Sequence, residues 1–147
     1  AMKIVICASV AFYEHVVAIK NQLEASGVQT VIPKTARAME AANDYTVRKT
    51  WYDNAEDYDK KADLMRAHFD EIANGDAILV VNDEKHDIKG YIGPNVLMEM
   101  SLAWYQQKPI YLPNELPVDS AFEEELKGMM PTILNNDLDI LLRDARK

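Results

Sequence analysis

Apolar residues along the chain fall into two alternating patterns, short continuous runs and longer segments with helical spacing. Continuous apolar runs predict strands at residues 3–8, 28–32, 77–82, 109–112 and 132–134. Apolar positions three or four residues apart predict helices at residues 12–26, 57–74, 94–107, 121–129 and 137–143. The run at 77–82 is apolar on both faces, which is typical of a central strand in a parallel sheet.

This alternation of strands and helices predicts an α/β fold with right-handed crossovers. We expect one domain over residues 1–147, a flavodoxin- or Rossmann-like three-layer sandwich around a five-stranded parallel sheet of order 2-1-3-4-5. Such a sheet binds ligands at the carboxyl ends of strands 1 and 3, where the strand order reverses. The loops at 8–13 and 83–93 would therefore line one crevice.

Residues 34–56 contain no convincing strand, although they carry cationic and aromatic side chains such as Arg48, Trp51 and Tyr52. An excursion of this length is often a lid or a binding loop. A helical insertion or an oligomer contact is the alternative, and the sequence leaves both open.

Glu99 is the only charged residue in the apolar segment 94–107. None of the residues three, four or seven positions away is cationic, so no neighbour on the same helix face can neutralise it. An ionised carboxylate on an apolar face costs several kcal/mol unless it is hydrogen-bonded. Glu99 is therefore either paired with a distant residue or kept for chemistry. Its plainer interpretation is a structural carboxylate bonded to backbone.

The turn before this helix favours ligand binding. Gly90 and Gly93 would let the backbone approach a ligand closely, and the helix N-terminus offers N–H groups and the positive end of a dipole. Asn95 lies four residues before Glu99 and could share its face.

The predicted helix at 57–74 precedes the central strand and carries further polar candidates. Its apolar side is expected to comprise Tyr58, Ala62, Met65, Phe69 and Ile72. Asp70 on this helix and Asp83 after the strand are each either a second acid or a solvated surface charge. His68 is expected to belong to the core or to line a groove.

Composition narrows the class of protein. The chain is 48% hydrophobic and 27% charged, as in an ordinary globular protein, and has no apolar run long enough for a membrane span. The net charge of −8 argues against nucleic-acid binding but allows a small phosphorylated ligand. The single cysteine, Cys7, is expected to be inert core in a reducing cytoplasm. No signal-peptide pattern is present, and Ala1 before Met2 is typical of a tag scar.

Several common motifs are absent. The chain has no Gly-x-Gly-x-x-Gly and no P-loop, and Ser9 lacks the context of a nucleophile elbow. His15, His68 and His86 are scattered without the spacing of a metal site. We therefore expect neither a metal nor an organic cofactor.

Three segments together resemble the nucleoside 2-deoxyribosyltransferase family, which includes the 2'-deoxynucleoside 5'-phosphate N-hydrolases. They are Ile6-Cys-Ala-Ser9, Asp76-Ala-Ile-Leu-Val-Val-Asn82 and Gly93-Pro-Asn-Val-Leu-Met-Glu99-Met-Ser-Leu-Ala103. The resemblance implies that Glu99 is the catalytic nucleophile, that Asp70 is its catalytic partner, and that Ala8 and Ser9 contact the sugar or phosphate. The full expected substrate-binding set is Ala8, Ser9, Tyr13, Asp83, Tyr91, Gly93 and Asn95.

The chain also departs from that family's pattern. Ala8 stands where the family has Gly, Ala11 and Phe12 stand where the N-hydrolases carry an Arg, and Asn95 takes the place of a Ser or Thr. The base, the sugar, the need for a 5'-phosphate and the choice between hydrolase and transferase thus remain open.

The resemblance implies cleavage or transfer at the N-glycosidic bond of a nucleoside or nucleotide through a covalent glycosyl-Glu99 intermediate. A non-catalytic nucleoside- or nucleotide-binding protein and a flavin binder are the alternatives on the same fold. The expected partner is this small molecule, with no nucleic acid and no membrane. A homo-oligomer is also expected, because Met98, Met100, Trp104 and Tyr105 offer more apolar surface than one helix stripe buries.

Overall fold

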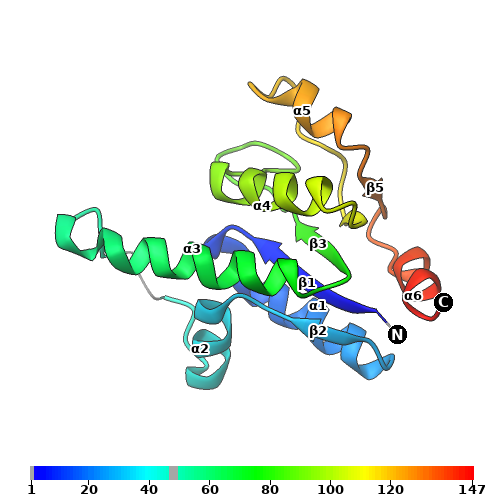
Figure 1. The fold of residues 1–147 in the computed structure, drawn as a ribbon, viewed down its shortest axis with the longest axis horizontal. Helices are drawn as coiled ribbons and strands as arrows, with labels where there is room; N and C mark the ends of the chain where they lie inside the picture. The colour runs from blue at the N-terminus through cyan, green and yellow to red at the C-terminus, as the bar shows by residue number, and fades with distance from the viewer. Residues whose placement is uncertain (1, 47–49) are drawn as a thin grey trace.

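The computed structural model describes residues 2–46 and 50–147, so the expectations for Ala1 and Arg48 lie outside the described residues. Five parallel strands form one sheet in the order β2-β1-β3-β4-β5, which confirms the predicted fold class and strand order (Figure 1). The strands are β1 (Lys3–Ala8), β2 (Gln29–Val31), β3 (Ala77–Val81), β4 (Ile110–Leu112) and β5 (Thr132–Ile133).

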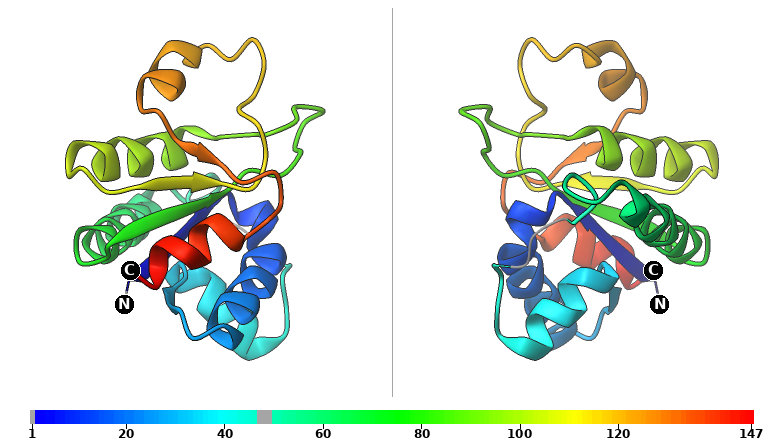
Figure 2. Two further views of the ribbon diagram at one scale, coloured as in Figure 1. Left: turned by 90° about the vertical axis from the view of Figure 1, so that its right-hand side faces the viewer. Right: turned by 90° about the vertical axis from the view of Figure 1, so that its left-hand side faces the viewer.

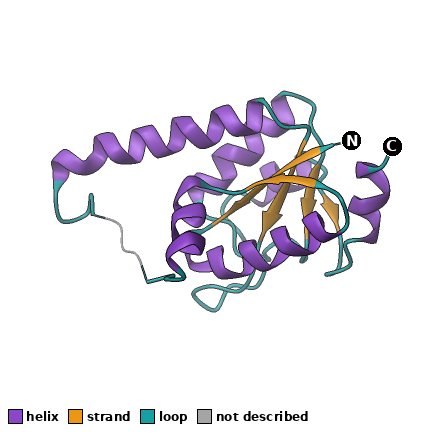
Figure 3. Ribbon diagram, turned by 90° about the horizontal axis from the view of Figure 1, so that it is seen from below, coloured by secondary structure: helices purple, strands orange, loops and turns teal. Residues whose placement is uncertain are grey.

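Helices connect the strands and cover both faces of the sheet (Figure 3). The α-helices are α1 (Tyr13–Ala25), α2 (Lys34–Ala42), α3 (Tyr58–Ala73), α4 (Pro94–Tyr105), α5 (Glu123–Gly128) and α6 (Asp139–Ala145). Two short 3₁₀ helices, η1 (Val10–Phe12) and η2 (Ala55–Asp57), precede α1 and α3. Within the described part of the chain, none of these helices has the length and apolar character that crossing a bilayer would require.

Alternation along the strands divides the core into two layers. Ile4 and Ile6 of β1 pack with residues of α1, α2 and α6, whereas Val5 and Cys7 pack with residues of α3, α4 and α5. Figure 2 shows α4 and α5 on one side of the sheet and α1 and α6 on the other. Every residue of β3 is buried, as its continuous apolar run predicted. The pleat thus directs Cys7 toward the layer that contains Glu99.

Helix α3 presents only part of its predicted apolar side to the interior, because Ile72 is buried and Met65 lines the cavity described below, whereas the first two positions point outward. Tyr58 and Ala62 are exposed, and His68 and Ile72 are the buried residues of the helix. The face turned toward the cavity described below includes Lys61, Leu64, Met65 and His68, so two polar residues are part of the inward side. A histidine can lie on an inward face where partners satisfy its ring nitrogens.

The segment 34–56 is partly helical, because α2 occupies its first nine residues. Ala36 and Met39 anchor α2 in the core layer of α1. The first part of the segment is therefore a packed helix, and only its later part remains a candidate lid.

The loop between β3 and α4 is held against the segment after β4. Asn82, fully buried at the end of β3, donates hydrogen bonds to the carbonyls of Asn114 and Glu115 at 3.0 and 3.1 Å. Gly90 has a φ of +70°, and a Cβ there would collide with the Glu115 carbonyl. These contacts fix the loop that leads to Gly93 and α4.

Candidate functional site

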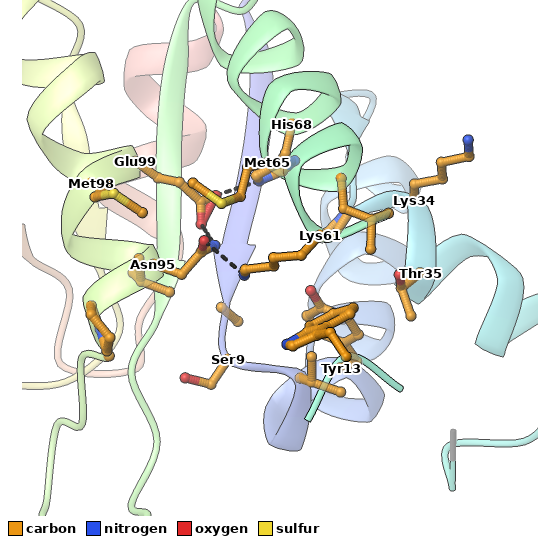
Figure 4. A pocket seen from close by; sticks show the side chains of 18 of the residues that line it. Ser9, Tyr13, Lys34, Thr35, Lys61, Met65, His68, Asn95, Met98 and Glu99 are labelled. Atoms are coloured by element: carbon orange, nitrogen blue, oxygen red, sulfur yellow. Dashed lines mark hydrogen bonds and ion pairs between the residues drawn. The ribbon is translucent and has the colours of Figure 1, made fainter. Parts of the chain in front are cut away.

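A cavity of about 480 Å³ opens at the carboxyl ends of β1 and β3, between α1, α3 and α4 (Figure 4). Helix α4 begins there, with Gly93 at its N-cap and Pro94 in its first turn. Most of the expected site residues line this cavity: Ala8, Ser9, Tyr13, Tyr91, Gly93, Asn95 and Glu99. Residues far apart in the sequence therefore meet where the strand order reverses, as expected for this sheet topology.

Glu99 lies in the second turn of α4 and is only 2% exposed. Asn95, one turn earlier, donates a hydrogen bond from Nδ2 to Oε1 at 3.1 Å. His68 of α3 places Nε2 3.0 Å from Oε2. Figure 4 shows both side chains converging on the carboxylate. Glu99 therefore has the distant partner that its own helix face lacks.

His68 links Glu99 to a second carboxylate. Its Nδ1 lies 3.1 Å from Glu71 Oε2, and Arg37 donates a hydrogen bond to Glu71 Oε1 at 3.0 Å. Burial alone would lower the pKa of His68, but the acidic groups Cys7, Glu71 and Glu99 outweigh burial and raise it. Burial likewise opposes ionisation of Glu71, yet His68 and Arg37 lower its pKa. At neutral pH we therefore treat His68 as an imidazolium between two carboxylates.

Cys7 closes this group from the sheet side. One ligand atom each from Cys7, His68 and Glu99 lies within 4.8 Å of the others, and all three residues are buried. Burial, reinforced by the negative charge of Glu99, raises the pKa of the Cys7 thiol to about 11. The sulfur therefore carries its proton at neutral pH.

Two atoms of the group are poorly satisfied. The 3.0 Å contact between His68 Nε2 and Glu99 Oε2 is an ion pair without the direction of a hydrogen bond. Neither atom has a hydrogen-bond partner elsewhere in residues 2–46 and 50–147. Buried polar atoms without a hydrogen-bond partner are uncommon in native structures. Each of them calls for a physical explanation, such as a catalytic role or a bound water or ion.

Lysines supply positive charge to the cavity. Lys61 donates a hydrogen bond to Asn95 Oδ1 at 3.1 Å (Figure 4). Its Nζ also lies over the Trp51 ring, 5.6 Å from the ring centroid. The first bond orients the Asn95 amide so that its nitrogen faces Glu99. Lys34 and Lys85 also line the cavity.

The structure does not bring Asp70 or Asp83 into the cavity lining. Asp70 is exposed and lies two residues beyond His68, which places it about 200° around α3. Asp83 instead pairs with His15 Nδ1 at 2.7 Å. From α3, the residue that contacts Glu99 is therefore His68, where the family resemblance pointed to Asp70.

From the sequence, His68 was expected only in the core or in the lining of a groove, and Lys61 was not among the expected site residues. The available signal was their spacing, because residues 61, 64, 65, 68 and 72 follow one face of a helix. Pairing of His68 with Glu99 has no local sequence signature, since the residues belong to different helices. Compared with known proteins, the chain matches no family model and no curated protein.

Proposed function

We propose that the protein cleaves or transfers at the N-glycosidic bond of a nucleoside or nucleotide, with Glu99 as the nucleophile. The observation that carries the proposal is a buried carboxylate held by Asn95 and His68 in the cavity at the carboxyl ends of β1 and β3. The resemblance of the segments around Ser9, β3 and Glu99 supplies the reaction class.

In the proposed reaction Glu99 attacks C1' of the sugar. A C1'–O bond to the carboxylate forms while the C1'–N bond breaks, and the electron pair of the broken bond leaves with the base. Water or a second nucleobase then attacks C1' while the C1'–O bond to Glu99 breaks, and the proton that the attacking group loses returns to the group that protonated the first base. The transition states resemble an oxocarbenium ion, as in retaining glycosidases. Asn95 and His68 keep the carboxylate oriented between the two steps.

The departing base needs a proton, and the group that gives it must touch the ligand. Asp70 and Asp83 do not line the cavity, so neither is placed to protonate the departing base. Tyr13 lines the cavity, and burial together with the charge of Glu99 raises the pKa of its phenol. Tyr13 is our candidate donor because it lines the cavity and keeps its proton at neutral pH, although its raised pKa makes it a weak acid. Trp51 is the surface on which the base stacks.

A second candidate function is ligand binding without turnover. It is favoured by the fact that both oxygens of Glu99 are already engaged, one by Asn95 and one by His68. A structural carboxylate would be held by the same two neighbours. In that case Glu99 would fix the site and hydrogen-bond a ribose hydroxyl.

Release of free base from a panel of nucleosides and nucleotides distinguishes the two functions. We expect the native protein to release base and Glu99→Gln to be inactive in its folded fraction, because Gln cannot act as an anionic nucleophile. Asp70→Asn is the matched control, since it neutralises an exposed acid on α3 and should retain activity. A fluorinated substrate analogue should leave a glycosyl adduct on Glu99 by mass spectrometry. An active Glu99→Gln variant would exclude nucleophilic catalysis by this residue.

A further inference from the structure

Cys7, His68 and Glu99 form a buried cluster of metal-ligand atoms, which we call the buried triad. A sulfur, an imidazole nitrogen and a carboxylate oxygen lie within 4.8 Å of one another. The three residues come from β1, α3 and α4, so no short sequence spacing could reveal the cluster. Thiolate, imidazole and carboxylate are the donors that Zn²⁺ and Co²⁺ accept in proteins.

An independent observation points to a missing ligand. His68 Nε2 and Glu99 Oε2 are both buried and lack a hydrogen-bond partner among the described residues, although they lie 3.0 Å apart. Both atoms face the interior of the triad and not bulk solvent. A cation between them and the Cys7 sulfur would satisfy both with one charge.

Neighbouring side chains form the hydrogen bonds that orient metal ligands in proteins. A metal-binding histidine usually donates its second N–H to a carboxylate, and His68 Nδ1 lies 3.1 Å from Glu71, which Arg37 holds in turn. The other oxygen of Glu99 accepts a hydrogen bond from Asn95. Each ligand that has a second polar atom therefore has that atom already fixed.

The triad adjoins the cavity. His68 and Glu99 line the cavity, which gives a metal ion an entry path and leaves a fourth position for water. One thiolate and one carboxylate match the charge of a divalent cation, so the filled site would be neutral inside the protein. Three protein ligands with an open position are the arrangement of accessible zinc sites, in contrast to closed structural ones.

We propose that the buried triad binds a divalent cation of the zinc class through Cys7 Sγ, His68 Nε2 and Glu99 Oε2. Binding replaces the protons of the Cys7 thiol and of the His68 ring, and both protons leave to solvent. The bound ion coordinates Glu99 Oε2, the carboxylate oxygen that faces His68. This coordination immobilises the Glu99 side chain. The cation is therefore an inhibitor of base release, a consequence that rests on the proposed function, whereas the metal binding itself does not.

Titration of the chelator-treated full chain with Co²⁺ tests the site directly. We expect a stoichiometric complex with a thiolate-to-cobalt charge-transfer band in the near ultraviolet and visible bands of tetrahedral Co²⁺. Cys7→Ser should abolish the charge-transfer band, and Glu71→Gln should weaken affinity by about 10–100-fold through loss of outer support. His15→Gln and Asp70→Asn are the controls, because they remove possible surface ligands outside the triad. Absence of the band from the native protein, or its persistence in Cys7→Ser, would overturn the proposal.

A measurement on the native chain tests the site without depending on whether the variants fold. X-ray absorption of the Zn²⁺ complex should show one sulfur at about 2.3 Å and nitrogen or oxygen neighbours at about 2.0–2.1 Å. A first shell without sulfur would exclude the triad as the site.

Failure of this inference and failure of the proposed function give different results. Base release in the presence of a chelator supports catalysis by free Glu99, and loss of that activity when Zn²⁺ is added supports inhibition. Cobalt binding without base release would retain the metal site and reject the glycosidic chemistry. Base release that Zn²⁺ does not inhibit, with no cobalt band, would reject the metal site and retain the chemistry.

Discussion

His68 Nε2 lies 3.0 Å from Glu99 Oε2, and both side chains are almost completely removed from solvent. The pair joins α3 to α4 beside the cavity and is extended by Glu71 on one side and Asn95 on the other. Removal of one partner from such a pair leaves the other as an uncompensated buried charge. The two residues therefore depend on each other for stability.

Substitution of Glu99 and substitution of His68 should lower the free energy of unfolding by different amounts. An imidazole releases its proton near neutrality, so Glu99→Gln can leave a neutral His68, and we expect a loss of about 1–3 kcal/mol in the free energy of unfolding. His68→Gln leaves the Glu99 carboxylate buried without its cationic partner. We therefore expect about 3–5 kcal/mol for His68→Gln by denaturant unfolding.

The double variant provides the control for this prediction. Because it removes both charges, its loss of stability should be smaller than the sum of the two single losses. Strictly additive losses would show that the pair has no coupling energy and would count against an imidazolium at His68.

A pH-dependent contribution to stability is expected far from the cavity, where Tyr111 of β4 donates a hydrogen bond to Asp144 of α6 at 2.6 Å. This bond lowers the pKa of Asp144 from 3.8, whereas burial and the same carboxylate raise the pKa of Tyr111 from 10.0. The contribution of Asp144 is present above about pH 3.8 and is lost as pH falls through its folded-state pKa. The contribution of Tyr111 is present below pH 10.0 and is lost as pH rises from there.

Tyr111→Phe tests this linkage with a matched shape. The native protein should unfold at a higher temperature than the variant by a constant margin between about pH 4 and pH 10. The margin should shrink at both extremes, as measured by circular dichroism across the pH range. A difference in unfolding temperature that grows in acid would contradict the expected loss of the Asp144 contribution.

Residues 50–56 are the part of the candidate lid that the structure describes next to the cavity. Thr50, Trp51 and Tyr52 line it, and Lys61 lies over the Trp51 ring. We expect hydrogen exchange of this segment to slow when a nucleoside or nucleotide binds, because the ligand would be covered by these side chains. Unchanged exchange at proven saturation would argue against a lid.

Tryptophan fluorescence gives a second test, because the chain has two tryptophans. In a Trp104→Phe background, the emission of Trp51 should shift on ligand binding. The converse variant, Trp51→Phe, retains Trp104 on α4 and should show no shift. A response from Trp104 alone would place the ligand elsewhere.

The exposed apolar surface of α4 predicts self-association. Met98, Trp104 and Tyr105 are 42%, 54% and 80% exposed, whereas Met100, which we also expected to contribute, is fully buried in the core. We expect a homodimer by light scattering, and Trp104→Ala with Tyr105→Ala should raise its dissociation constant about tenfold or more. Val118→Ala is the control, since Val118 is equally exposed but lies outside α4. A monomer mass at high concentration would contradict this prediction.

Much of the fold could be predicted because β1, β3 and β4 are short runs that are apolar on both sides of the sheet. The continuous run of β3 and the alternation of strands with helices predicted the parallel sheet and its strand order correctly. The inward face of α3 was predicted correctly at Met65 and Ile72 but incorrectly at Tyr58 and Ala62, which the structure exposes. Apolar periodicity cannot identify a polar residue whose partners lie on another element.

The sequence by itself determined that Glu99 is an unusual carboxylate on an apolar helix and that its helix begins at the carboxyl edge of a parallel sheet. Both conclusions follow from local spacing and from the direction of the crossovers. Only the tertiary structure decided that His68 and not Asp70 reaches Glu99, and that Cys7 lies beside them. The reason is geometric: the rotation of α3 about its axis and the pleat of β1 set which side chains meet, and neither is encoded in the spacing of one segment alone.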